Sequence, residues 1–216
     1  MPSIRPFRSA ILAALLLLSA CESPEERAQR HYQAGVAYLQ QGDVDRALVE
    51  FRNVFKLDGK HREARIAYAE AERGRGNLRE AFSQYLRLLE QYPQDKDALR
   101  ALVQMAADNG QWDDALKYSA EALQVTPADA EMQALKIYAD YGIALAANDS
   151  ARVVSALSAA KDLRQRQPQN LYLARIIIDD LIRAQFADQA LAELNAAIAL
   201  APKERLFYAQ RLSIYA

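Results

Sequence analysis

A spacing of 34 residues recurs in this chain of 216 residues and constrains its fold more than any other feature. Three alanines, three glycines and three turn-forming residues keep this step: Ala47, Ala81 and Ala115; Gly42, Gly76 and Gly110; Gly59, Pro93 and Pro127. A fixed period of this length is typical of stacked supersecondary units that bury their apolar faces against their neighbours. Because Gly and Pro are sparse while Ala and Leu dominate, the units are predicted to be helical.

Residues 1–20 have the layout of a secretory signal peptide. Arg5 and Arg8 precede the apolar run 10–18, and the small residues Ser19 and Ala20 follow it. The run has about half of the roughly 20 residues that a spanning helix needs, which favours a signal peptide over a permanent transmembrane anchor.

The formal net charge of −1 offers no basic surface for nucleic acid, so we predict no nucleic-acid partner.

The only cysteine, Cys21, comes directly after this segment. Residues 18–21 (Leu-Ser-Ala-Cys) resemble the bacterial lipobox, in which the cysteine is acylated and becomes the mature N-terminus. The resemblance implies that residues 21–27 are a lipidated tether, since several acyl chains on one residue anchor a protein stably. Glu22 stands where Asp commonly signals retention in the inner membrane, so the resemblance implies the periplasmic face of the outer membrane of a Gram-negative bacterium. An uncleaved anchor in the inner membrane is the alternative.

From Ala28 onward the chain resembles the tetratricopeptide repeat (TPR) family. In that family small residues recur at two places in each repeat and large apolar residues at two others. The first repeat has Gly35, Tyr38, Ala47 and Phe51 at these places. The resemblance implies an all-α fold, a right-handed superhelical solenoid of helix-turn-helix repeats over residues 28–216. We predict repeats at 28–61, 62–95, 96–129, 130–170 and 171–204, and a partial repeat at 205–216.

The 34-residue period lengthens once, in the fourth repeat. Ala115 and Ala156 are 41 residues apart, so the fourth repeat has gained seven residues. We predict most of them in its first helix, roughly 131–147, which would then project about 10 Å beyond its neighbours.

Three polar residues each follow a turn that contains Pro and are predicted to be N-caps: Asp95, Asp129 and Asn170.

The segment 205–216 carries five large apolar residues, namely Leu206, Phe207, Leu212, Ile214 and Tyr215. A solenoid usually closes with a polar capping helix that covers its last apolar face. We therefore expect this chain to be the N-terminal part of a longer repeat protein.

Few residues in the chain have the spacing of a catalytic or metal site. His31 occupies a helix-packing position and His61 a turn, and neither has a cysteine or an acidic residue at metal spacing. Phosphate-binding loops and nucleophile elbows are also missing from the sequence. The sequence thus predicts no enzyme activity, cofactor, metal or small-molecule substrate.

The TPR resemblance places the binding surface in a concave groove lined by the first helix of each repeat. Six candidate groove residues follow from their positions: Glu70, Arg100, Tyr138, Tyr141, Arg175 and Asp179. Aromatic rings with arginines suit an extended or helical peptide. The pattern slightly favours a core position for Tyr138 and leaves Tyr141 open between the core and an exposed docking knob. Tyr32 and Val36 stand where TPRs that bind chaperone C-termini have Lys and Asn, which argues against that function.

Together these features predict a lipid-anchored periplasmic scaffold or adaptor that binds proteins or peptides of the cell envelope. Three groups of lipoproteins share this design: those of exopolysaccharide export, outer-membrane protein assembly and type IV pilus assembly. The alternative is an adaptor segment of a longer protein, or of an enzyme whose active domain lies beyond residue 216.

Overall fold

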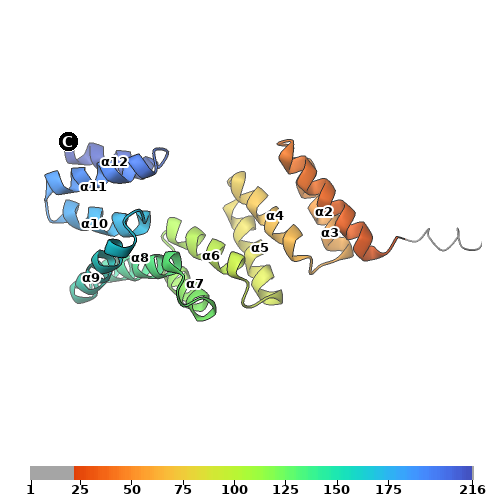
Figure 1. Cartoon of the computed structure of the whole chain (residues 1–216), viewed down its shortest axis with the longest axis horizontal. Coiled ribbons are helices and arrows are strands. Elements are labelled where there is room, and N and C mark those ends of the chain that lie inside the picture. Colours follow the sequence, from red (N-terminus) through yellow and green to blue (C-terminus); the bar gives the residue numbers. More distant parts are fainter. Residues whose placement is uncertain (1–21, 216) are drawn as a thin grey trace, which may run out of the picture. The chain divides into compact units, whose positions relative to one another are not determined.

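The computed structural model describes residues 22–215, so Cys21 and the predicted signal peptide lie outside the described residues. Over this range the chain forms eleven helices and no strand, which confirms the all-α prediction. In chain order, as coloured in Figure 1, they are α2 (Pro24–Gln40), α3 (Val44–Leu57), α4 (Arg62–Gly74), α5 (Leu78–Gln91), α6 (Lys96–Asp108), α7 (Trp112–Val125), α8 (Ala130–Ala146), α9 (Ser150–Arg166), α10 (Leu171–Arg183), α11 (Ala187–Leu200) and α12 (Arg205–Tyr215). Among these helices, none is long and apolar enough to cross a membrane.

The described chain divides within α5 into two compact units, one ending at Gln84 and the other beginning at Tyr85. In the second unit α6 packs on α7, α8 on α9, and α10 on α11. Helix α8 also contacts both α6 and α10. The first helices of successive pairs therefore adjoin one another, as expected of stacked helical repeats.

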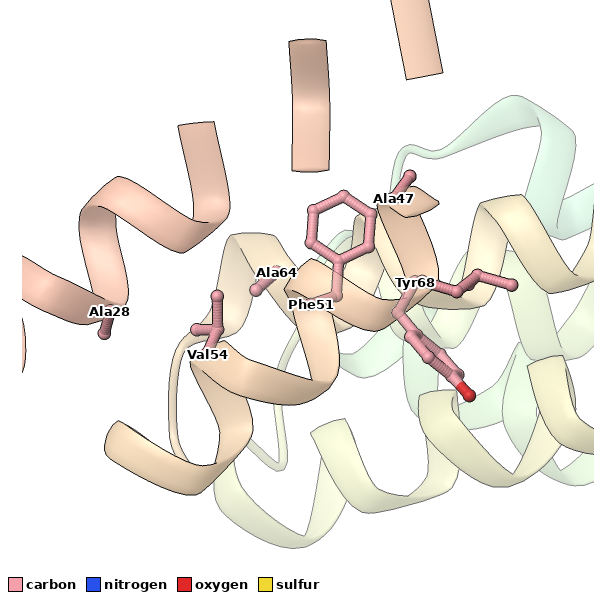
Figure 2. Packing of buried hydrophobic residues seen from close by; sticks show 7 residues of the cluster. Ala28, Ala47, Phe51, Val54, Ala64 and Tyr68 are labelled. Atoms are coloured by element: carbon pink, nitrogen blue, oxygen red, sulfur yellow. The ribbon is translucent and has the colours of Figure 1, made fainter. Parts of the chain in front are cut away.

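Helices α2, α3 and α4 of the first unit enclose one apolar core, part of which Figure 2 shows around Phe51 and Tyr68. Phe51 is fully buried, and its ring approaches α2 at Gly35. A Cβ atom on Gly35 would lie 2.6 Å from Cε1 of Phe51, closer than packed carbon atoms can come. This contact explains why the repeat pattern has its smallest residue at this place.

A left-handed residue ends the first helix of each pair and accounts for the spacing of the glycines. Among residues 22–215, five have a positive φ: Gly42 (77°), Gly76 (81°), Gly110 (69°), Asn148 (54°) and Gln185 (62°). The amide that follows each one donates to the carbonyl five residues earlier, as from Asn77 to Glu72 at 2.9 Å. This pairing is the Schellman motif, in which glycine is favoured because it lacks a Cβ. Asn148 and Gln185 fill the same role in the fourth and fifth pairs.

Replacing Gly76 with alanine is expected to lower the free energy of unfolding by about 1 kcal/mol, because an L-residue is strained at this φ. A Cβ here would meet nothing within 4 Å, so the cost is conformational and not steric. Gly74, at the end of α4, is equally open but lacks the positive φ. Alanine there should be neutral or stabilising by up to about 1 kcal/mol. Urea unfolding of both variants checks this, and equal effects would contradict it.

The three predicted N-caps are confirmed. The side chain of Asp95 accepts a hydrogen bond from the amide of Ala98, which opens α6. Asp129 accepts from two amides at the start of α8, and Asn170 from two at the start of α10. Each satisfies amides that would otherwise have no partner at the first turn of the helix.

Of the seven extra residues of the fourth pair, four lie in its first helix and three in its second, so the prediction that most lie in the first helix is confirmed by a margin of one residue. Helix α8 has 17 residues where α6 and α10 have 13, and α9 has 17 where the other second helices have 14. About one turn is added to each helix, and the loop that joins them stays as short as in the other pairs. Four residues extend α8 by about 6 Å, less than the predicted projection.

Helix α12 buries one large side chain and exposes three. Phe207 is fully buried against residues of α10 and α11. Leu206, Leu212 and Tyr215 are exposed. Of the apolar residues noted in this segment, Ile214 also packs against the core.

Candidate functional site

A cleft of about 630 Å³ opens on the second unit, where the first helices of its pairs lie side by side. Residues from α6, α8, α10 and the start of α12 line it: Asp108, Tyr138, Leu171, Tyr172, Arg175, Glu204 and Leu206. It therefore contains Tyr138 and Arg175, two of the groove residues predicted from the sequence. Aromatic rings, aliphatic side chains and charges meet in this one place.

Arg175 is the central residue of the cleft. Its Nη1 lies 3.3 Å from Oδ1 of Asp108 and its Nη2 lies 3.1 Å from Oε2 of Glu204. Only 13% of its side chain is exposed. Burial opposes its charge, but Tyr138 and the two carboxylates outweigh burial and raise the pKa of Arg175 above its ordinary value.

The bond from Arg175 to Asp108 joins residues 67 positions apart. Asp108 ends α6 and Arg175 lies on α10, so the bond connects the third and fifth helix pairs. Contacts in a helical repeat protein normally link adjacent repeats. Here one arginine reaches past α8, and its guanidinium lies 6.0 Å from the centre of the Tyr138 ring.

Aromatic rings surround the arginine and continue into the core. The guanidinium lies 5.3 Å from the centre of the Tyr172 ring and 5.9 Å from that of Phe207. These distances are within the range of cation–π interactions. Tyr138 contacts Tyr172 and meets the edge of Trp112 at 5.2 Å between ring centres. Burial is the largest cause that raises the pKa of both tyrosines, so both hydroxyls are neutral at physiological pH.

Tyr141 lies in the core and not on an exposed knob. Its ring is buried among residues of α8, α9 and α10, and its hydroxyl donates to Oδ2 of Asp179 at 2.6 Å. Burial and the hydrogen bond to Asp179 raise the pKa of Tyr141. Asp179 also accepts from Nε of Arg183 at 2.8 Å. These two predicted residues therefore contact each other, but they do not line the cleft.

Arg100 and Glu70 also lie outside the cleft. Arg100, on α6, pairs with Asp129 at 2.7 Å and with Glu131 at 3.5 Å. Burial raises the pKa of Asp129, but hydrogen bonds from the Met132 amide and Arg100 outweigh it, so this pKa lies below its usual range. Glu70 belongs to the first unit, where it pairs with Arg73 at 3.2 Å.

Five of the residues that line the cleft were not predicted from the sequence. Tyr172 could have been predicted, because it lies three residues before Arg175 and thus on the same helix face. The others lie at helix ends or turns, where the repeat pattern does not assign a groove position: Asp108, Leu171, Glu204 and Leu206.

The two histidines have structural partners. Nδ1 of His31 lies 2.6 Å from a carboxylate oxygen of Glu50 on α3, and Nδ1 of His61 accepts from the Ala64 amide as the N-cap of α4. Within residues 22–215, no three His, Cys, Asp or Glu side chains are grouped as a metal ion would require.

Comparison with known proteins agrees with the repeat pattern. Residues 38–105 match the family model TPR_19, described as a tetratricopeptide repeat. A search of curated proteins finds no match.

Several solved structures share the fold at low sequence identity. A structure of MamA from Desulfovibrio magneticus RS-1 (residue 41 to the end) is 15% identical with a TM-score of 0.64, and the match covers 83% of this chain and 97% of that one. A TPR protein from Parabacteroides merdae is 13% identical with a TM-score of 0.65, over 88% of this chain and 73% of that protein. YrrB, titled a TPR protein with an unusual peptide-binding site, is 17% identical with a TM-score of 0.58, over 83% and 89%. Residues 38–105 therefore match the tetratricopeptide repeat by sequence, and the chain shares its helical fold with solved TPR proteins.

Proposed function

We propose that this protein is a non-enzymatic scaffold that binds protein or peptide partners through the cleft of its second unit. The observation that carries the proposal is the convergence of four helices on one partly open cleft with two tyrosines, two leucines and a fixed arginine. Tyr and Arg are enriched where proteins bind one another tightly, because they combine large contact area with directed hydrogen bonds. YrrB, which has the same fold, is titled as having a peptide-binding site.

The proposal extends to the location of the scaffold. The signal-like segment 1–20 and Cys21 support a lipid anchor, and Glu22 supports the periplasmic face of the outer membrane. A scaffold held there would serve envelope assembly or export, in a polysaccharide, outer-membrane protein or pilus system.

Metabolic labelling with a palmitate analogue tests the anchor. We expect the native protein to incorporate the label and to fractionate with the outer membrane, and the Cys21→Ser variant to lose both properties. Undiminished membrane attachment of the variant would reject lipidation and favour an uncleaved anchor in the inner membrane.

Capture of partners from crosslinked envelopes tests the cleft, and α12 offers a matched pair of variants. Leu206 lines the cleft and is 42% exposed, whereas Leu212 lies on the same helix, is 69% exposed and does not line it. Because Leu206→Arg places a bulky charged side chain in the cleft, we expect it to reduce the yield of the main partner at least about tenfold. Leu212→Arg should leave the yield unchanged. Equal yields from both variants would count against the cleft as the binding site.

A further inference from the structure

The charge that the cleft presents to solvent is negative, although an arginine lies at its centre. The Arg175 side chain is 13% exposed, and each of its two terminal nitrogens already has a carboxylate partner. The carboxylates are the outer groups, since the Asp108 side chain is 55% exposed and that of Glu204 is 36% exposed. The lining residues thus carry two negative charges against one buried positive charge.

Each carboxylate contacts Arg175 through one of its two oxygens. Asp108 uses Oδ1 and Glu204 uses Oε2. The second oxygen of Glu204 accepts only a long bond, 3.4 Å, from the Leu206 amide. A carboxylate has about four acceptor sites, so both residues retain capacity for another donor.

The rings and leucines of the cleft suit a long cationic side chain. Tyr138 and Tyr172 line the cleft and already contact one guanidinium at distances typical of cation–π contacts. Leu171 and Leu206 line the same cleft and offer apolar surface to methylene groups. Arginine and lysine bury such stems along apolar surface while their charged heads meet polar groups.

An anionic group would bind less well at the same place. To reach the buried Arg175, it must displace Asp108 or Glu204 and then lie beside the displaced carboxylate, where like charges repel. The second unit as a whole also disfavours anions, since residues 85–216 contain fourteen Lys and Arg against seventeen Asp and Glu, a net charge of −3. Such a charge attracts cationic partners over distances of about 10 Å at moderate ionic strength.

We propose that the cleft recognises an arginine side chain of the partner, held between Asp108 and Glu204 with its guanidinium against Tyr172. The inference rests on the proposed function, because it takes this cleft to be the contact surface. Arginine fits better than lysine, since its planar head both stacks on a ring and donates to two carboxylates at once.

Three short peptides that differ only at a central residue test this inference. They carry arginine, its neutral isostere citrulline, or glutamate within the same alanine and leucine flanks. Trp112 is the only tryptophan and contacts Tyr138, so its fluorescence can report occupancy of the cleft. We expect the arginine peptide to bind at least about tenfold more tightly than the citrulline peptide, as the loss of a charge-assisted hydrogen bond implies. The glutamate peptide should bind most weakly.

Variants that neutralise Asp108 or Glu204 test whether these two carboxylates bind the arginine peptide. Asp108→Asn and Glu204→Gln should each weaken binding of the arginine peptide by about tenfold and leave the citrulline peptide unaffected. Asp162→Asn removes one negative charge from an exposed position on α9 and should leave both affinities unchanged. Thermal unfolding of each variant verifies that the unit remains folded.

Two outcomes would overturn the inference. If citrulline or glutamate binds as tightly as arginine and Leu206→Arg abolishes that binding, then the cleft binds peptides but does not select a cation. If none of the three peptides binds, the arginine inference fails, whereas the proposed function is judged separately by capture of the native partner with Leu206→Arg and Leu212→Arg.

Discussion

Replacing Phe207 with alanine is expected to detach α12 from the second unit. Phe207 is the one fully buried large side chain of this helix and packs among Ala174, Ile178, Leu194 and Ala197. Truncation of a buried phenylalanine costs about 3–5 kcal/mol, from the lost apolar contact and the cavity left behind. Because α12 packs on α10 and α11 around this side chain, the loss should appear as local unfolding of α12.

Hydrogen exchange of the α12 amides measures this effect, and exchange should accelerate in Phe207→Ala while amides of α6 and α7 keep their protection. The same variant should weaken partner binding, since Glu204 and Leu206 line the cleft from the start of this helix. Leu212→Ala is the control, because its side chain is exposed and its loss should change stability by less than about 0.5 kcal/mol. Unchanged exchange in Phe207→Ala would show that α12 is held by other contacts.

Replacing Gly142 with alanine should produce the second large effect. Gly142 lies in α8 directly against the indole of Trp112 at the start of α7, and a Cβ there would come within 2.4 Å of Cδ2 of that ring. The indole must therefore shift, and it also contacts Tyr138 of the cleft. Overpacking of this kind costs about 1–3 kcal/mol. Urea unfolding followed by circular dichroism gives the size of the loss, and the fluorescence of Trp112 reports the shift.

A double mutant separates overpacking from other causes. In a Trp112→Leu background the ring is gone, so Gly142→Ala should cost much less than in the native chain. The difference between the two costs is the coupling energy of the pair, which we expect to be roughly 1–2 kcal/mol. If the glycine substitution costs the same in both backgrounds, the close approach of the indole is not the reason for glycine at this position.

The features that depend on local rules could be predicted from the sequence. The 34-residue period and the scarcity of Gly and Pro predicted helical repeats, and the three N-caps follow from polar residues placed after turns. The ladder of Gly42, Gly76 and Gly110 is also local, because each supplies the left-handed residue of a Schellman motif. Gln185 shows the limit of such signals, since it adopts a φ of 62° that its side chain does not favour.

The cleft depends on contacts that a repeat pattern does not encode. Period and position identify which residues share a helix face, and they placed Tyr138 and Arg175 correctly on the first helices. They did not show that Arg175 would be buried, because its partner Asp108 comes from a helix end in another repeat and its partner Glu204 from a turn. The projection of the fourth pair was overestimated for a related reason. A count of residues between alanines does not show how they divide between two helices, and three of the seven lie in α9.

The position of Arg175 changes how its role should be tested. The terminal nitrogens of Arg175 are paired with carboxylates, and aromatic rings pack around its guanidinium. Substitution of Arg175 would therefore remove a structural contact between the third and fifth helix pairs as well as any contact with a partner. Exposed residues on the rim, such as Leu206, are therefore better probes of binding than the buried arginine.

Photocrosslinking in cells tests the central claim most directly, namely that partners bind in the cleft of the second unit. A photoreactive amino acid placed at Leu206 lies in the cleft, and the same residue at Leu212 lies on the same helix but outside the cleft. We expect position 206 to give a discrete crosslinked product with an envelope protein and position 212 to give none. Crosslinking at 212 alone, or at neither position while the protein still copurifies with its partner, would contradict the claim.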